Sequence, residues 1–220
     1  VAAVGFKTVR IPIDFFGSRT SGDTSGYSKN KNSSSSYSGS ASDYIVSSAY
    51  LDRIEQVIQW SLNQGLITIL DFHGSTLKSE FTYTFSAKDK WSAYYTDPTS
   101  AKRAADNQKF RAIWAQIANR FKDYSDNLIF EVINEPYFWI SDDEMDVLNT
   151  DIISIVRNSG SKNTDRNIII TGGSKNSYEA PLQIANSILN SDDNLIATFH
   201  YYWPRDFTAS SEESHNDYNW

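Results

Sequence analysis

Five short apolar runs, separated by long polar or amphipathic stretches, most constrain the fold of this chain. The runs are rich in Ile, Val, Leu and Phe and are solidly apolar, which is typical of strands buried on both faces of a parallel sheet. Parallel neighbours need a long crossover between them, usually a helix. The runs lie at 4–13, 66–70, 128–133, 167–171 and 195–199.

The stretches between these runs have helical spacing. Apolar residues recur every three or four positions within 46–63, 110–121 and 145–155, and a shorter helix is expected at 180–189. Residues 18–42 are too rich in Ser, Gly, Asn and Lys to build a core. Because the alternation continues on both sides of them, we expect a surface-loop insertion within one domain that spans 1–220.

Polar residues at the strand ends decide between two folds, a doubly wound open sheet and a (β/α)8 TIM barrel. No glycine-rich phosphate loop follows the first strand, which weakens the nucleotide-binding open sheet. In a barrel, the carboxyl ends of the strands converge on one face, where active sites are built. We therefore predict a barrel, with these residues near or just past strand ends: Arg10, His73, Asn134, Glu135, His200 and Tyr202.

Composition narrows the classes of function. A formal charge of -7 without a basic cluster argues against nucleic acid and anionic membranes as partners. There is no cysteine and no apolar stretch of ~18 residues that would span a membrane. The histidines lack zinc-ligand spacing, and no nucleophile elbow for a Ser-His-Asp triad is present, so no metal or cofactor is expected. The 6 Trp, 13 Tyr and 12 Phe suit either core packing or a sugar-binding cleft.

Four motifs in order resemble glycoside hydrolase family 5, a clan A family of cellulases and mannanases. They are Thr8-Val9-Arg10-Ile11-Pro12, Ile69-Leu70-Asp71-Phe72-His73, Phe130-Glu131-Val132-Ile133-Asn134-Glu135-Pro136 and Phe199-His200-Tyr201-Tyr202. The resemblance covers nearly the whole chain and corresponds to barrel strands two to six. It implies a secreted, endo-acting, retaining β-1,4-glucanase that acts on β-linked polysaccharides or oligosaccharides and is a monomer when intact.

The resemblance makes Glu135 the general acid/base. A glycosidic oxygen leaves poorly until it is protonated, and a carboxylic acid with a raised pKa supplies that proton near neutral pH. Asn134 would bond the 2-hydroxyl of the sugar at the cleavage site. This bond strengthens as the oxocarbenium-like state develops.

Arg10 has two interpretations. Either it supports the nucleophile carboxylate, as the resemblance implies, or it forms a structural ion pair with Glu131 or Asp71. His73 and His200 would line the cleft, and Tyr202 would contact the nucleophile. The candidate stacking residues are Trp139, the best placed, and Trp91, Tyr94, Tyr95 and Trp203.

Two features leave questions open. Many family members carry a second His where this chain has Gly74, so an endo-β-mannanase, a β-1,3-glucanase and a non-catalytic carbohydrate-binding barrel remain alternatives. Strands seven and eight, and with them the nucleophile, are not visible. We therefore expect a domain that is incomplete at both ends and inactive by itself, since Glu179, Glu212 and Glu213 have no strand before them.

Overall fold

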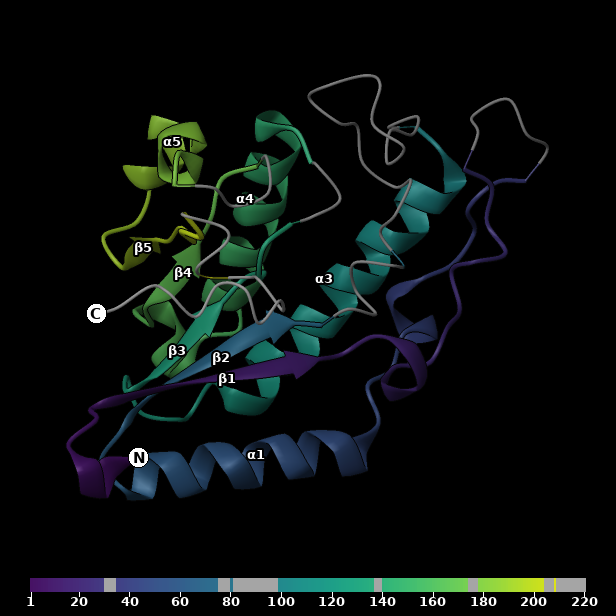
Figure 1. Cartoon of the computed structure of the whole chain (residues 1–220). Helices are drawn as coiled ribbons and strands as arrows, with labels where there is room; N and C mark the ends of the chain where they lie inside the picture. Colours follow the sequence, from purple (N-terminus) through teal and green to yellow (C-terminus); the bar gives the residue numbers. More distant parts are fainter. Residues whose placement is uncertain are drawn as a thin grey trace, which may run out of the picture.

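The strands form one parallel sheet. The computed structural model describes residues 1–29, 35–74, 80, 99–136, 140–173, 178–203 and 208. Within these ranges the sheet has the order β1-β2-β3-β4-β5, so each strand pairs with the next in the chain (Figure 1). The strands are β1 (Thr8–Asp14), β2 (Ile67–His73), β3 (Leu128–Glu131), β4 (Ile168–Ile170) and β5 (Leu195–Ala197).

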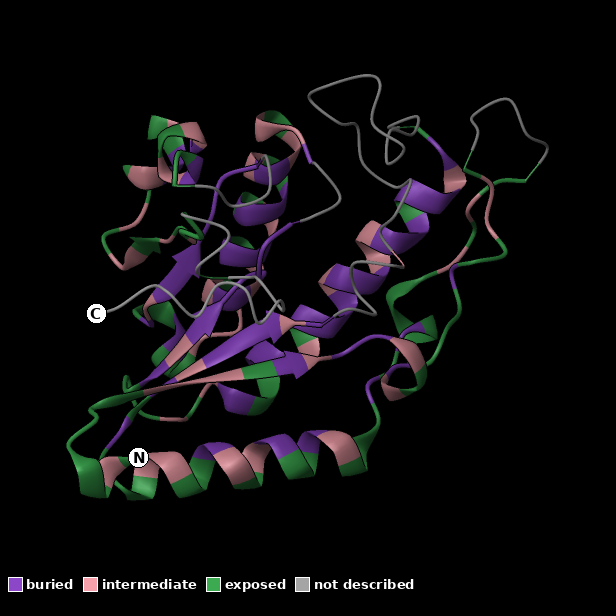
Figure 2. Cartoon of the chain, in the orientation of Figure 1, coloured by how far each residue is buried: buried purple, intermediate pink, exposed green. Residues whose placement is uncertain are grey.

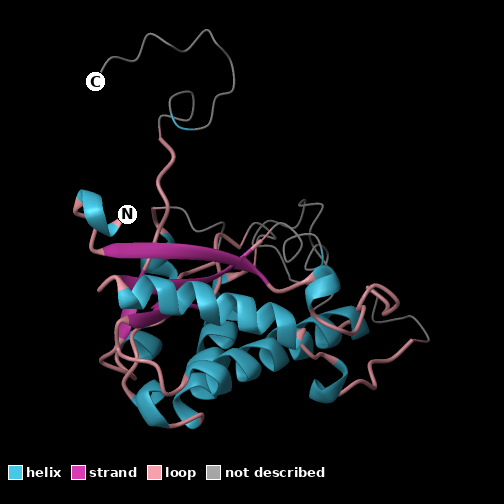
Figure 3. Cartoon of the chain, turned by 90° about the horizontal axis from the view of Figure 1, so that it is seen from below, coloured by secondary structure: helices cyan, strands magenta, loops and turns pink. Residues whose placement is uncertain are grey.

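Three long helices lie on one side of the sheet (Figure 3). They are α1 (Ser48–Asn63), α3 (Ala101–Phe121) and α4 (Asp142–Asn158). Parallel strands joined in order through helices form an arc of a (β/α)8 barrel, which confirms the predicted fold class. Among the described residues, no helix is long and apolar enough to cross a membrane.

The core lies between the sheet and these helices (Figure 2). The ring of Phe72 on β2 is 4.9 Å from those of Phe15 and Phe110 and 5.8 Å from that of Trp114. Neighbouring side chains along a strand point to opposite faces. Phe72 faces the helices. Its two neighbours on β2, which are Asp71 and His73, therefore lie on the inner face of the arc, away from the helices.

Two helices differ from the sequence prediction. The helix expected at 180–189 is divided into η6 (Ala180–Gln183) and α5 (Asn186–Leu189), because Ile184 and Ala185 between them are extended. Helix α3 begins well before the apolar stripe at 110–121. Its first half buries charged side chains, which hydrophobic spacing does not detect; these are Lys102, Arg103, Asp106 and Lys109.

The Ser-rich insertion at 18–42 is fastened at its base. Thr20 forms an antiparallel bridge with Val46, and Ser21 N donates to Ile45 O at 2.9 Å. At the C-terminal end of the insertion, the short helix η3 (Ala41–Asp43) leads into the buried Tyr44. The two ends of the insertion thus return to the same place, which is compatible with one continuous domain.

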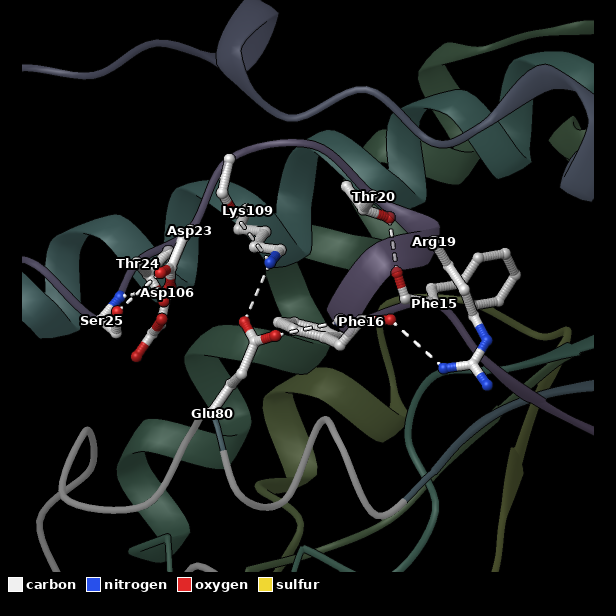
Figure 4. Close-up of polar contacts among 12 residues, drawn as sticks. Phe15, Phe16, Arg19, Thr20, Asp23, Thr24, Ser25, Glu80, Asp106 and Lys109 are labelled. Carbon is white, nitrogen blue, oxygen red and sulfur yellow. Dashed lines mark hydrogen bonds and ion pairs between the residues drawn. The ribbon is translucent and has the colours of Figure 1, made fainter.

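A buried lysine of α3 joins the segments that follow β1 and β2 (Figure 4). Lys109 Nζ donates to Glu80 Oε2 at 2.9 Å and to Gly22 O at 3.0 Å, and it lies 4.8 Å from the ring centroid of Phe16. Glu80 Oε1 accepts a bond from Gly17 N at 3.0 Å. One ion pair therefore fixes both segments to α3 on the side of the sheet where the strands end.

A second buried lysine, Lys102, lies about two helical turns before Lys109 in α3 and is held in a similar way. Lys102 is ion-paired with Asp106, which is fully buried, and donates to Glu80 O at 2.7 Å and to Thr24 Oγ1 at 3.2 Å. All three ammonium hydrogens thus have acceptors, as a buried charge requires.

Arg166, just before β4, is fully buried and caps the end of α3. Burial lowers its pKa to about 10. The positive charge lies at a helix C-terminus, where the helix dipole favours cations. Its guanidinium donates to the carbonyl oxygens of Phe121, Tyr124, Ser125 and Leu128 and to the side chain of Asn163.

Candidate active site

Arg10 lies at the centre of a charged cluster on the inner face of the sheet. Its guanidinium bonds both carboxylate oxygens of Glu131, with Nε to Oε2 at 2.6 Å and Nη2 to Oε1 at 2.7 Å. Nη2 also lies 2.9 Å from Asp71 Oδ2. Burial alone would lower the pKa of Arg10, but the bond to Glu131 and the charges of Asp71, Glu131 and Glu135 raise it. Arg10 thus makes both of the ion pairs considered from the sequence.

A ring of hydrogen bonds joins this cluster to Asn134 and His73. Arg10 Nη2 donates to Asn134 Oδ1 at 2.9 Å, and Asn134 Nδ2 lies 3.4 Å from His73 Nε2. His73 Nδ1 lies 2.6 Å from Asp71 Oδ2, the oxygen that Arg10 also contacts. The ring brings together three of the predicted site residues, and its fourth member, Asp71, is fully buried.

Glu135 occupies a strained position in the segment that follows β3, three residues separating it from the last residue of that strand, Glu131. Its φ is 31°, in the left-handed region that side chains with a Cβ disfavour, and Pro136 follows it. Only 5% of the residue is exposed. A non-glycine residue held in such a conformation marks a place where surrounding structure fixes the backbone, and such places cluster at functional sites.

His200 and Tyr202 hold the carboxylate of Glu135 from the end of β5. His200 Nδ1 and the Tyr202 hydroxyl both contact Glu135 Oε1. The hydrogen bond to Glu135, together with burial, raises the pKa of Tyr202 to about 12. The resemblance implied that Tyr202 contacts the nucleophile, whereas here its hydroxyl donates to Glu135. Tyr201 lies apart from Glu135, with its ring 6.0 Å from that of Tyr178.

Asp14 accounts for the glycine that departs from the family pattern. Gly74 has a φ of +116°, and a Cβ there would lie 2.1 Å from Asp14 Cγ. Asp14 is the residue on β1 that pairs with His73. A larger residue at 74 would therefore displace the carboxylate beside His73, an exclusion that the sequence did not reveal.

The remaining candidates are less informative. Trp203 is 71% exposed, and Glu179 is also exposed, at the start of η6. Within the described ranges, no group of three metal-binding side chains comes together. The other named residues lie outside those ranges: Trp91, Tyr94, Tyr95, Trp139, Glu212 and Glu213.

Two sets of site residues therefore meet toward the carboxyl ends of the strands. One is the ring of Arg10, Asn134, His73 and Asp71, and the other is Glu135 with His200 and Tyr202. Arg10 was expected near a strand end but is the third residue of the seven in β1, and only its long side chain reaches the other site residues. The two sets lie side by side. Asn134 of the first set is the chain neighbour of Glu135 in the second, and the charge of Glu135 raises the pKa of Arg10. A buried carboxyl next to fixed amide and imidazole groups can exchange a proton with a bound ligand.

Comparison with known proteins identifies relatives of the whole chain. A model of the family described as cellulase (glycosyl hydrolase family 5) matches residues 1–220. Endoglucanase H of Acetivibrio thermocellus is 33% identical over 94% of the chain, which spans 18% of that protein. Endoglucanase B of Paenibacillus lautus is 30% identical over 99% of the chain, which spans 35% of it.

A solved structure shares the fold. The tri-modular family 5 (subfamily 4) endo-β-1,4-glucanase from Bacillus licheniformis, complexed with cellotetraose, matches 94% of the chain with a TM-score of 0.68 and 27% identity. The chain covers 33% of that protein. In each case the chain corresponds to a minor part of a longer relative.

Proposed function

Since the chain belongs to glycosyl hydrolase family 5, we propose that it carries the acid/base side of the active site of an endo-acting, retaining β-1,4-glucanase. The observation that carries the proposal is the buried Glu135, held at a strand end by His200 and Tyr202. The relatives named endoglucanases, and the relative complexed with cellotetraose, support β-1,4-glucan as the substrate class. β-1,4-glucan is a polymer, and a polymeric substrate implies a secreted or extracellular enzyme.

In this mechanism Glu135 acts twice. As an acid it donates its proton to the glycosidic oxygen, so that the leaving sugar departs as a neutral alcohol. As a carboxylate it then removes a proton from the water that hydrolyses the glycosyl-enzyme. Glu135 Oε1 accepts a hydrogen bond from the Tyr202 hydroxyl and contacts His200 Nδ1. These contacts keep the carboxyl in the same position in both steps.

The ring beside Glu135 prepares the sugar-binding side. Asn134 directs its amide toward the 2-hydroxyl, and His73 lines the cleft next to it. Arg10 supplies a positive charge near the attacking carboxylate of the retaining mechanism. That second carboxylate stands roughly 5–5.5 Å from the first in retaining enzymes. As in the sequence analysis, we expect this second carboxylate outside the five strands described here.

The test is hydrolysis by the protein that contains this chain. We expect cleavage of carboxymethylcellulose, with less of mannan or laminarin, and loss of that activity in Glu135→Gln, whose amide cannot donate an acidic proton. A substrate with a very good leaving group should lose much less in its first step. Proton NMR should show the β-anomer forming first from a β-glucan. An initial α-anomer, or an undiminished Glu135→Gln, would contradict the proposal.

A further inference from the structure

We propose that Asp71 is a positioning residue which, through His73 and Arg10, sets the orientation of the Asn134 amide and hence its bond to the 2-hydroxyl of the substrate. The role of Asn134 rests on the proposed function, whereas the orientation of its amide does not. Asp71 itself contacts neither substrate nor Glu135 in this scheme. The inference follows from the directions of the three hydrogen bonds in the ring and from the ion pair between Arg10 and Asp71 that closes it.

The first direction is set by Arg10. A guanidinium has only donors, so the Asn134 atom that lies 2.9 Å from Arg10 Nη2 has to be the amide oxygen. The amide nitrogen must then face His73 Nε2, at 3.4 Å. Turning the amide over would place two donors against each other at Arg10, so the ion-paired guanidinium locks the Asn134 amide.

The second direction is set at His73. Asn134 Nδ2 is a donor, so His73 Nε2 has to accept, and the proton of a neutral imidazole then lies on Nδ1. Nδ1–H points at Asp71 Oδ2, at 2.6 Å. An ionised carboxylate accepts only, so Asp71 selects this tautomer and no other. Asp71 Oδ2 also lies 2.9 Å from Arg10 Nη2, which closes the ring.

Burial makes the selection strong. Asp71 is 0% exposed and Asn134 is 1% exposed, so water does not compete for these bonds. An asparagine at position 71 has almost the same shape, and Arg10, which has only donors, keeps its amide oxygen at the place of Asp71 Oδ2. That oxygen carries no net charge and is a weaker acceptor for His73 Nδ1–H than the carboxylate is. The preference for the Nδ1–H tautomer therefore weakens, and the Nε2–H tautomer, which turns a donor toward the Asn134 NH2 group, gains population. Asn134 then keeps its bond to Arg10 but loses its contact with His73.

The first experiment measures the tautomer of His73 directly, in the 220-residue chain, by long-range 1H–15N NMR. There are three histidines, so a His73→Gln sample assigns the signal. We expect the Nδ1–H tautomer in the native chain and a shift toward Nε2–H in Asp71→Asn. Asp106→Asn is the matched control, because Asp106 is equally buried and ion-paired but belongs to α3, and it should leave His73 unchanged. Nε2–H or doubly protonated His73 in the native chain would overturn the proposal.

The second experiment asks whether the effect reaches the 2-hydroxyl. In the protein that contains this chain, Asp71→Asn should lower kcat on an aryl β-cellobioside by about 10- to 100-fold, as expected for a small displacement of a transition-state contact. On the same glycoside lacking the 2-hydroxyl at the cleaved sugar, Asp71→Asn and the native protein should differ less than about 3-fold. Asn134→Ala should follow the same pattern.

Equal losses on the two glycosides would mean that Asp71 acts on overall structure, and the proposal would be wrong. If the native protein cleaves neither glycoside, the proposed function fails. The NMR result then still decides whether Asp71 orients Asn134, so the two failures are distinguishable.

Discussion

Glu135 combines burial, backbone strain and an ionisable group at one position, and each of the three is unfavourable alone. The left-handed conformation costs about 1–3 kcal/mol, which the surrounding fold must offset. The result is a carboxyl pointed at His200 and Tyr202 rather than along the strand. The sequence predicted the residues of this site from their order after apolar strands. It could not predict the ring through Asp71, because the Arg10–Asn134 and Asn134–His73 contacts join residues more than 60 positions apart.

The strain at Glu135 predicts a difference between two inactive variants. Glycine adopts a positive φ without penalty, whereas alanine retains the Cβ. Glu135→Gly should therefore be more stable than Glu135→Ala by about 1 kcal/mol, although glycine usually destabilises. Urea denaturation of the two variants measures the difference. A less stable glycine variant would show that φ at this position relaxes when the side chain is removed.

The pKa of Tyr202 reports on the charge of Glu135. The hydrogen bond to Glu135 and its negative charge raise this pKa to about 12, since both disfavour the phenolate. In Glu135→Gln the charge is gone, so the pKa of Tyr202 should fall toward 10. Titration of 13C-labelled tyrosine, with Tyr202→Phe to assign the signal, measures both values. An unchanged pKa in Glu135→Gln would indicate that burial alone holds it.

At the scale of elements, the helices show which signals a sequence carries. Apolar spacing predicted α1 and α4, whose stripes face the sheet. It missed the first half of α3, because Lys102 and Lys109 are buried through ion pairs that no periodicity reveals. It also joined η6 and α5 into one helix, since nothing in the composition of 180–189 marks the extended Ile184.

Arg166 shows how much one buried side chain contributes to an element. Arg166→Met leaves the carbonyl oxygens at the end of α3 without their donor, and a buried unsatisfied group costs about 1–3 kcal/mol. We expect a loss of roughly 3 kcal/mol or more in the free energy of unfolding, measured by urea denaturation. Arg111→Met removes an ion pair with Asp151 in which the two side chains are 33% and 32% exposed, and it should cost less than about 1 kcal/mol. Similar losses in both variants would contradict this account of Arg166.

At the scale of the molecule, the sheet has two edges, β1 and β5, within the described residues. Apolar side chains are exposed near both. Phe6 is 64% exposed before β1, and Ile196 and Phe199 are 41% and 53% exposed at β5. An unpaired, apolar strand edge is a template for pairing with another chain. The apolar runs predicted the parallel arc, but the sequence could not say how its edges are covered, because that depends on contacts outside these strands.

The edges predict self-association of the 220-residue chain in isolation. Ile196→Lys places a charge on the edge strand and should shift sedimentation velocity profiles toward the monomer. Val147→Lys is the matched control, because Val147 is 52% exposed but lies on α4, away from both edges, and it should leave the profile unchanged. Equal effects of the two changes would point to general solubility and not to strand pairing.

The cap on α3 also imposes an order on synthesis. Arg166 leaves the ribosome about 40 residues after the carbonyl oxygens of Phe121, Tyr124, Ser125 and Leu128 that it binds, a delay of several seconds at ~5–20 residues per second. During that interval, α3 and β3 can form, but the turn between them has no donor to close it. The nascent chain therefore passes through a state in which α3 can be packed on the earlier strands while the carbonyl groups at its C-terminal end still lack their donor.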